Sequence, residues 1–223
     1  MNAASVSVTR TNPFDTVLRE RPLEWTECED MPTPQRFDGA DLARGRLLGL
    51  IDQSWRRRAG CKGPACASLL AECGLPMPDL PNSFVETAEG GLVCRLGRSE
   101  FLVENGSGES LLARLGSLEG LSGVYPVLRQ DGSLLLTGSR IEDLLLQTCS
   151  LDFARLAATP GQLVLTTMVG VGVTALWLRA AGPLEGPALR LWFDGTYGDY
   201  MWSTLAEIAG ELGGGPVGLA ATR

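Results

Sequence analysis

The feature that most constrains the fold of this chain is a regular alternation of short strand-like and helix-like segments after residue 84. Strand-like runs of Val, Leu and Phe are bounded by glycine, whereas helix-like runs repeat their apolar residues at helical spacing. From Leu92 onward the predicted order is β-β-α-β-β-α-β-β-β-α. Two ferredoxin-like βαβ halves fit this order. Helices inserted between antiparallel strand pairs predict an α+β fold, in which helices cover one face of antiparallel sheets.

Four local signals place turns and caps within this pattern. Asp131-Gly132 lies between two strand-like runs and predicts a tight hairpin. The Gly-Val-Gly sequence at 170–172 also predicts a turn between strands, because it lacks the strand-turn-helix context of a dinucleotide-binding loop. Ser139 and Glu142 have the spacing of a capping box, and Thr196 is the predicted cap of the last helix.

Residues before 76 show less periodicity and are predicted to extend a main domain. Residues 1–45 are interpreted as an extended arm, and an apolar stripe in 39–60 predicts one helix. The prolines of 74–82 predict an extended passage. The predicted organisation is an arm, helix and cysteine-containing extension over 1–75, a main domain over 76–212 and a flexible tail over 213–223.

Composition excludes several function classes. The chain has no histidine, so it cannot by itself build a Ser-His-Asp centre, a Cys-His centre or a zinc site with His ligands. A net charge of −7 argues against general nucleic-acid binding. Three arginines at 56–58 are interpreted as the solvated end of a helix, in preference to a phosphate or partner patch. The longest apolar stretch, 163–178, is short for a membrane span, and no secretory signal is visible, so a cytoplasmic protein is expected.

Cysteines form the one metal-like constellation in the sequence. Cys61, Cys66 and Cys73 are close in sequence, and Cys28 is the candidate for a fourth ligand. Thiolates favour zinc or an iron–sulfur cluster. Their spacing differs from that of zinc ribbons and of plant-type ferredoxins, so small buried thiols are the favoured interpretation and a metal site is the alternative.

Aromatic residues around the last helix form a second candidate site. Trp192, Tyr197, Tyr200 and Trp202 are spread around the predicted helix and do not form one stripe, so the sheet can cover only some of them. Tyr and Trp are enriched at protein interfaces, and these four residues are therefore predicted to form one. Asp194, just before the helix, is interpreted as a complement to the helix dipole.

Four stretches carry a resemblance to a known family: LPMPDLPNSF at 75–84, LGRSEFLVE at 96–104, CSLDF at 149–153 and LRLWFDGTYGDYMWSTLAEIAG at 189–210. In these stretches the chain resembles the gamma subunit of heterotetrameric sarcosine oxidase, which belongs with the folate-binding domains of the glycine-cleavage T-protein type. Phe101 stands where that family often has Trp. The first 70 residues are longer than in the usual gamma subunit.

The resemblance implies a T-protein-like domain and larger catalytic subunits as partners. The first hypothesis is an accessory interface subunit of a heteromeric oxidative amine demethylase, sarcosine oxidase-like or related. In it this chain binds no cofactor alone, and the complex carries flavin and tetrahydrofolate. The second is a tetrahydrofolate-binding subunit that captures formaldehyde as methylene-tetrahydrofolate, with Asp152 and Asp194 as candidate folate contacts. The third is a metal or electron-transfer subunit that uses Cys28, Cys61, Cys66 and Cys73.

Overall fold

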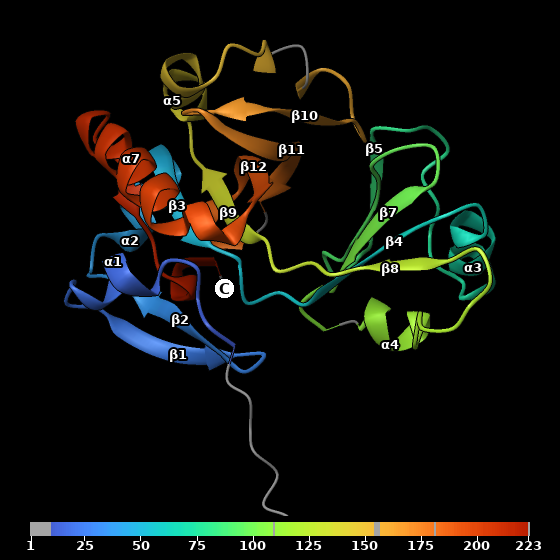
Figure 1. The fold of residues 1–223 in the computed structure, drawn as a ribbon. Coiled ribbons are helices and arrows are strands. Elements are labelled where there is room, and N and C mark those ends of the chain that lie inside the picture. Colours follow the sequence, from blue (N-terminus) through green and yellow to red (C-terminus); the bar gives the residue numbers. More distant parts are fainter. Residues whose placement is uncertain (1–9, 109, 154–156, 181, 223) are drawn as a thin grey trace, which may run out of the picture.

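The computed structural model describes residues 10–108, 110–153, 157–180 and 182–222. Two large sheets dominate it, and each carries helices on its outer face (Figure 1). This is the expected α+β architecture with antiparallel sheets. The predicted order of strands and α-helices is found between Leu92 and Glu211, and the structure adds short 3₁₀ helices and one further strand after Glu211.

The larger sheet has six strands and holds the main core. Its order is β10 (Leu163–Met168), β11 (Val171–Ala180), β12 (Gly186–Phe193), β9 (Gly132–Thr137), β3 (Gly49–Asp52) and β13 (Gly215–Pro216). All neighbours are antiparallel except β13 and β3. Helices α5 (Ile141–Thr148) and α7 (Gly198–Glu211) bury their apolar residues against one face of this sheet.

The smaller sheet has five strands. Its order is β5 (Ser83–Glu86), β6 (Leu92–Arg95), β7 (Glu100–Glu104), β4 (Arg58–Lys62) and β8 (Tyr125–Val127). Helices α3 (Cys66–Glu72) and α4 (Leu111–Leu115) pack on its outer face around Phe101 and Val103. The inner face, which carries Leu102, is turned toward the six-stranded sheet.

The two sheets meet along one edge and pack inner face to inner face. At the edge, the Leu163 N–H donates to the Asn82 carbonyl (3.0 Å), and the Phe84 N–H donates to the Gly161 carbonyl (2.7 Å). Between the inner faces lies an apolar cluster that includes Leu102, Leu176 and Trp192. In Figure 1 β10 reaches toward β5 at this edge, and the sheets diverge from there.

Strand β12 shows how the sequence serves both faces of the six-stranded sheet. Side chains of a strand alternate between its faces. Leu189, Leu191 and Phe193 belong to the core under the helices, whereas Trp192 belongs to the cluster between the sheets. Arg190 has the same parity as Trp192 and therefore points toward the five-stranded sheet. It is a buried charge inside an otherwise apolar strand.

The N-terminal segment is folded from residue 10 onward, so the predicted extended arm is wrong there. It forms α1 (Asp15–Arg19) and a hairpin of β1 (Glu24–Cys28) and β2 (Met31–Arg36). Phe14 anchors it in the main core, with its ring centroid 5.1 Å from that of Trp202 and 6.1 Å from that of Phe193. Burial of apolar side chains such as Phe14 stabilises this segment, although its sequence has no periodic apolar pattern that would indicate burial.

The predicted helix over 39–60 is only partly correct. Helix α2 covers Asp41–Leu48, and the chain then enters β3 at Gly49. Gly49 suits this change because a Cβ there would meet the Gly45 backbone and the Thr137 hydroxyl at 2.8 Å. Residues 56–58 are not a helix end, since Arg58 begins β4 and is buried.

The predicted flexible tail is also wrong for the described residues. After α7 the chain forms β13, which pairs with β3, and the 3₁₀ helix η3 (Leu219–Thr222), which packs near β2. Val217 and Leu219 are almost fully buried. The six-stranded sheet includes β3 and β13, and the five-stranded sheet includes β4. Residues before 75 and after 212 therefore belong to the two sheets, and the predicted boundaries at residues 75 and 212 do not separate one sheet from the other.

Three predicted turn and cap signals differ in the structure. Asp131-Gly132 does not join a hairpin, because β8 pairs with β4 while β9 pairs with β3 and β12. Arg140, not Ser139, takes the N-cap position of α5. Tyr197, not Thr196, takes the N-cap position of α7, and Asp194 caps the preceding 3₁₀ helix η2 (Gly195–Tyr197) by accepting from the Thr196 N–H at 2.9 Å. The predicted turn between β10 and β11 is confirmed.

Candidate functional site

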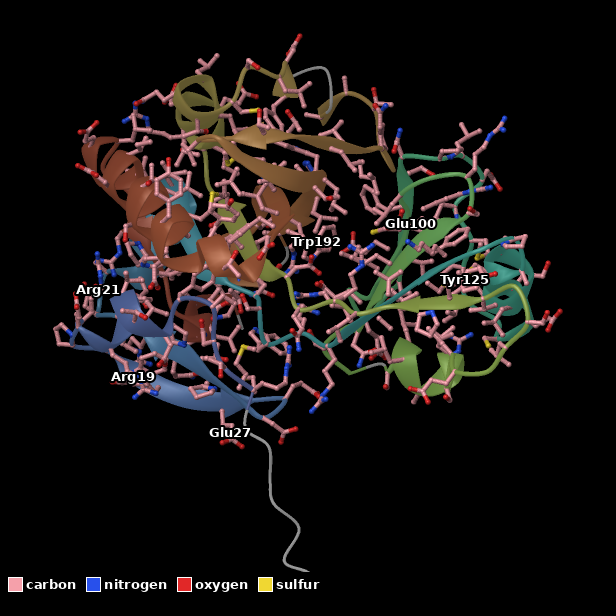
Figure 2. All side chains as sticks on the ribbon, viewed as in Figure 1. Arg19, Arg21, Glu27, Glu100, Tyr125 and Trp192 are labelled. Atoms are coloured by element: carbon pink, nitrogen blue, oxygen red, sulfur yellow. The ribbon has the colours of Figure 1, made fainter. Side chains whose placement is uncertain are left out.

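A buried ionic cluster joins the two sheets at their inner faces. Glu104 on β7 accepts hydrogen bonds at Oε2 from Arg58 Nε (3.1 Å) and from Trp192 Nε1 (2.8 Å). Arg190 on β12 lies 3.7 Å from the second oxygen, Oε1. The side chains of Glu104, Arg58 and Arg190 are 0%, 1% and 4% exposed. Figure 2 shows Trp192 between the sheets, on the side where they face each other.

Arg58 connects this cluster to both segments that cross between the sheets. One guanidinium nitrogen donates to the Asp131 carbonyl (2.6 Å), and another donates to the Gln53 carbonyl (3.1 Å). Gln53 lies between β3 and β4, and Asp131 lies between β8 and β9. The guanidinium group of Arg58 therefore links both crossing segments to the carboxylate of Glu104 on β7.

The charges in the cluster perturb one another. Burial would raise the pKa of Glu104, but the charges of Arg190, Arg58 and Arg56 and the hydrogen bond from Trp192 outweigh it and hold this pKa below its ordinary 4.5. Burial and the charges of Arg56 and Arg58 lower the pKa of Arg190 to about 10, despite the attraction of Glu104. At neutral pH three cations therefore surround one buried carboxylate.

Beside the cluster lies a cavity of about 430 Å³, here called the arginine cavity. Residues at the turn of the β1–β2 hairpin and residues of η3 form part of its wall. Arg190 lines it, and Arg56 lines it with its guanidinium carbon 4.9 Å from the ring centre of Trp55. The full lining is Cys28, Glu29, Gln53, Trp55, Arg56, Ser107, Leu135, Thr137, Ala180, Leu184, Arg190, Leu219 and Thr222.

Two adjoining hollows of about 500 and 610 Å³ are lined by the segment between β8 and β9. They share Arg129, Asp131 and Asp194 and are together called the aspartate groove. Trp192 lines the first hollow. Among the described residues Asp131 Oδ2 is buried without a hydrogen-bond partner, and burial raises the pKa of this carboxyl group despite the nearby Arg58 and Arg129.

The two candidate folate contacts lie in different surroundings. Asp194 lines the aspartate groove, and its carboxylate, held by the Thr196 N–H, has a pKa below the ordinary value. Asp152 is exposed in the segment after α5. Asp194 therefore lines a hollow that also holds a second acidic residue, Asp131, which the sequence analysis assigned to a turn and not to a site.

The four predicted interface aromatics divide into two pairs. Trp192 and Trp202 are buried at 2% and 0% exposure, the first between the sheets and the second on the side of α7 that faces the main core, so they belong to the core and not to a surface. Tyr197 and Tyr200 are each 50% exposed. They are three residues apart at the start of α7, on neighbouring positions of its surface.

The candidate metal ligands are not gathered into one site. Cys28 lies at the end of β1 in the hairpin, whereas Cys61 on β4 and Cys66 on α3 are buried together in the core of the five-stranded sheet. Cys73 only packs against that core. Burial raises the pKa of the Cys61 thiol to about 12, as does its hydrogen bond with Cys66. Within the described ranges no three His, Cys, Asp or Glu side chains are grouped to hold a metal ion.

Sequence reasoning missed Glu104, Arg190 and Arg56 as site residues. One signal was available for Arg190, because it interrupts the apolar run from Ala188 to Phe193 on the strand. A charged residue in such a run must find a partner when the strand is buried. The partner carboxylate is determined by how the two sheets pack, and no local sequence pattern indicates that packing.

None of the helices in the described part of the chain is long and apolar enough to span a bilayer. The longest of them, α7, has 14 residues.

Comparisons with known proteins reveal the fold type. No protein-family model and no curated protein matches the sequence. The glycine cleavage system aminomethyltransferase T from Bartonella henselae matches with a TM-score of 0.64 and 16% identity, over 96% of this chain and 61% of that one. A chain of the heterotetrameric sarcosine oxidase from Corynebacterium sp. U-96 matches with a TM-score of 0.62 and 16% identity, over 78% of this chain and 92% of that one.

These matches confirm the expected T-protein-like fold. At 16% identity they show the fold alone. The chain spans less than two thirds of the aminomethyltransferase but nearly all of the matched sarcosine oxidase chain.

Proposed function

We propose that this chain is an accessory subunit of a heteromeric, sarcosine oxidase-like oxidoreductase that demethylates N-methylated amines. The observation that carries the proposal is the match to 92% of one chain of a heterotetrameric sarcosine oxidase. A fold that spans almost all of such a chain is compatible with the same place in a complex. Larger partner chains would hold the flavin, and this chain would contribute architecture and contact surface.

The buried cluster supports a structural role for the space between the sheets. Glu104 is enclosed by Arg58, Arg190 and Trp192, so no substrate can reach its Oε2 without breaking these contacts. A general base must lie within hydrogen-bond reach of the proton that it takes from the substrate, and Glu104 does not meet this requirement. The cluster instead holds the sheets together and leaves the outer surface for partners.

Tyr197 and Tyr200 provide the surface for a testable contact. Each is half-exposed, Tyr197 as the N-cap residue of α7 and Tyr200 in its first turn, and Tyr200 is oriented by the hydrogen bond that its hydroxyl donates to the Val169 carbonyl (2.8 Å). Aromatic side chains held in one conformation lose little conformational entropy on binding and are typical interface hot spots. We infer that this pair touches a larger subunit.

Substituting both tyrosines with serine is expected to reduce recovery of the complex about tenfold or more, which corresponds to at least about 1.4 kcal/mol of association free energy. The measurement is affinity purification of the tagged chain from its native cells, with mass spectrometry of co-purifying chains and a visible spectrum for flavin. Glu207→Ser, at an exposed position later on α7, is the matched control. Recovery of a colourless single chain with the unaltered sequence would contradict the subunit proposal itself.

Tetrahydrofolate binding is the second candidate function, and the aspartate groove favours it. A pterin ring offers N–H donors, and the groove holds a buried carboxylate oxygen of Asp131 without a partner among the described residues, together with the carboxylate of Asp194. The indole of Trp192 at the groove adds an apolar wall. These residues would bind and orient the ring, and bound tetrahydrofolate would supply the acceptor for a one-carbon unit.

Asp131→Asn is expected to weaken tetrahydrofolate binding by the isolated chain about tenfold, because a charge-assisted hydrogen bond to the pterin becomes neutral. Equilibrium binding followed by tryptophan fluorescence measures the effect. Asp143→Asn, on the surface of α5, should bind as the unaltered chain does. Saturable binding that survives Asp131→Asn would place the ligand elsewhere, and no binding at all would remove this candidate while leaving the subunit proposal intact.

A further inference from the structure

The arginine cavity is lined by two guanidinium groups, those of Arg56 and Arg190, which share the negative charges of the nearby Glu104 and Glu86. Arg190 lies 3.7 Å from one carboxylate oxygen, Glu104 Oε1. It also donates a long hydrogen bond of 3.5 Å to the Ser133 hydroxyl. Its Nε is buried without a hydrogen-bond partner among the described residues, and the residue is 3% exposed. An unmatched donor of this kind is costly in a protein interior unless a ligand or water satisfies it.

Arg56 adds a second guanidinium group to the same cavity. Its Nε donates to the Gln53 side-chain oxygen (2.8 Å) and a terminal nitrogen donates to the Asn105 carbonyl (3.0 Å). Both acceptors are neutral, so they orient the group without cancelling its charge. Glu29 also lines the cavity, but its carboxylate pairs with Arg57 at 2.8 Å.

Part of the cavity wall is apolar. Leu135, Ala180, Leu184 and Leu219 lie around the same space and come from β9, β11, the 3₁₀ helix η1 (Gly182–Leu184) and η3. Ligand sites of a few hundred cubic ångströms commonly combine such walls with a small number of convergent polar groups. Here the convergent groups are cationic and the wall suits a hydrocarbon body.

We propose that the arginine cavity binds a small organic carboxylate, with the carboxylate between Arg56 and Arg190 and an apolar body against Leu135, Leu184 and Leu219. Guanidinium groups match carboxylates in geometry as well as charge. The ligand would place a negative charge between the two guanidinium groups and satisfy the Nε of Arg190. This site is separate from the aspartate groove, and it goes beyond the proposed subunit role, which neither requires nor excludes it.

Benzoate is the probe for the test, and benzamide is its neutral counterpart of nearly the same shape. Isothermal titration of the full chain is expected to show benzoate binding with a Kd of about 1 mM or lower, at least about tenfold tighter than benzamide. Arg56→Gln should weaken benzoate binding about tenfold or more, because it removes one of the two cations. Arg21→Gln, an exposed arginine near α1, should leave the affinity unchanged.

A second variant keeps the test valid if Arg56→Gln unfolds. Thr222 is half-buried on the cavity wall. The substitution Thr222→Trp should abolish benzoate binding because the indole fills the cavity. Equal affinity for benzoate and benzamide, or benzoate binding that neither variant reduces, would overturn the proposal. The absence of saturable benzoate binding would overturn it as well.

Discussion

Glu104→Gln is expected to lower the free energy of unfolding by about 3–5 kcal/mol, as measured by chemical denaturation at pH 7. The substitution removes the only carboxylate among the described residues that contacts both Arg58 and Arg190. Both guanidinium groups stay buried, and a neutral amide cannot compensate their charge. The cost comes from these uncompensated charges more than from the lost ion pairs themselves.

Glu100→Gln is the matched control for this experiment. Glu100 lies on the same strand, β7, and also pairs with an arginine, Arg129, at 3.0 Å. Its side chain is 43% exposed, so solvent screens the interaction and the expected loss is below about 1 kcal/mol. Similar losses for the two substitutions would show that burial of the cluster does not determine its contribution.

The same pair of chains gives a pH dependence with a defined sign. The pKa of Glu104 in the folded chain lies below its ordinary 4.5. The stabilisation from its ionised form is therefore complete above about pH 4.5 and is lost as the pH falls through the lower folded value. The stability difference between the unaltered chain and Glu104→Gln should shrink below pH 4.5. A difference that stays constant down to pH 3 would contradict the role of the charge.

The outer cores of the fold could be predicted from the sequence because they follow local periodicity. Residues 189, 191 and 193 alternate with 190 and 192, and the structure places the two sets on opposite faces of β12. The order of elements after Leu92 was predictable for the same reason. Such patterns record burial on one face directly in the sequence.

The inner junction could not be predicted because it depends on pairings between distant segments. Asp131-Gly132 has the sequence of a tight turn, yet the strands on either side of it join different sheets. Arg58 looked like the end of a solvated helix, but it pairs across β4 and β7 with Glu104, 46 residues away. Local propensity is a weak guide where long-range strand pairing decides the register. The candidate cavities lie at this junction, so Arg56, Arg190 and Asp131 were missed as site residues, whereas Asp194 was already a candidate.

Ending the chain after Gly214 is expected to lower the free energy of unfolding by about 3–6 kcal/mol, because Val217 and Leu219 are almost fully buried and each contributes about 1.5–3 kcal/mol. The deletion also removes three hydrogen bonds that tie the segment to the first part of the chain. They are Val217 N–H to the Leu50 carbonyl (2.9 Å), Gly218 N–H to Asp41 Oδ2 (2.9 Å) and Arg44 Nε to the Pro216 carbonyl (3.0 Å).

A chain ended after Ala221 separates this effect from shortening as such. It keeps β13, Val217 and Leu219, and it should lose less than about 1 kcal/mol, as expected for changes away from buried groups. Hydrogen exchange of the Val217 amide gives an independent measurement, since its bond to Leu50 should protect it. A flexible tail would instead leave stability unchanged in both shortened chains and the amide unprotected. Because Leu219 also lines the arginine cavity, the longer deletion should abolish benzoate binding, which links the fold of the terminus to the proposed site.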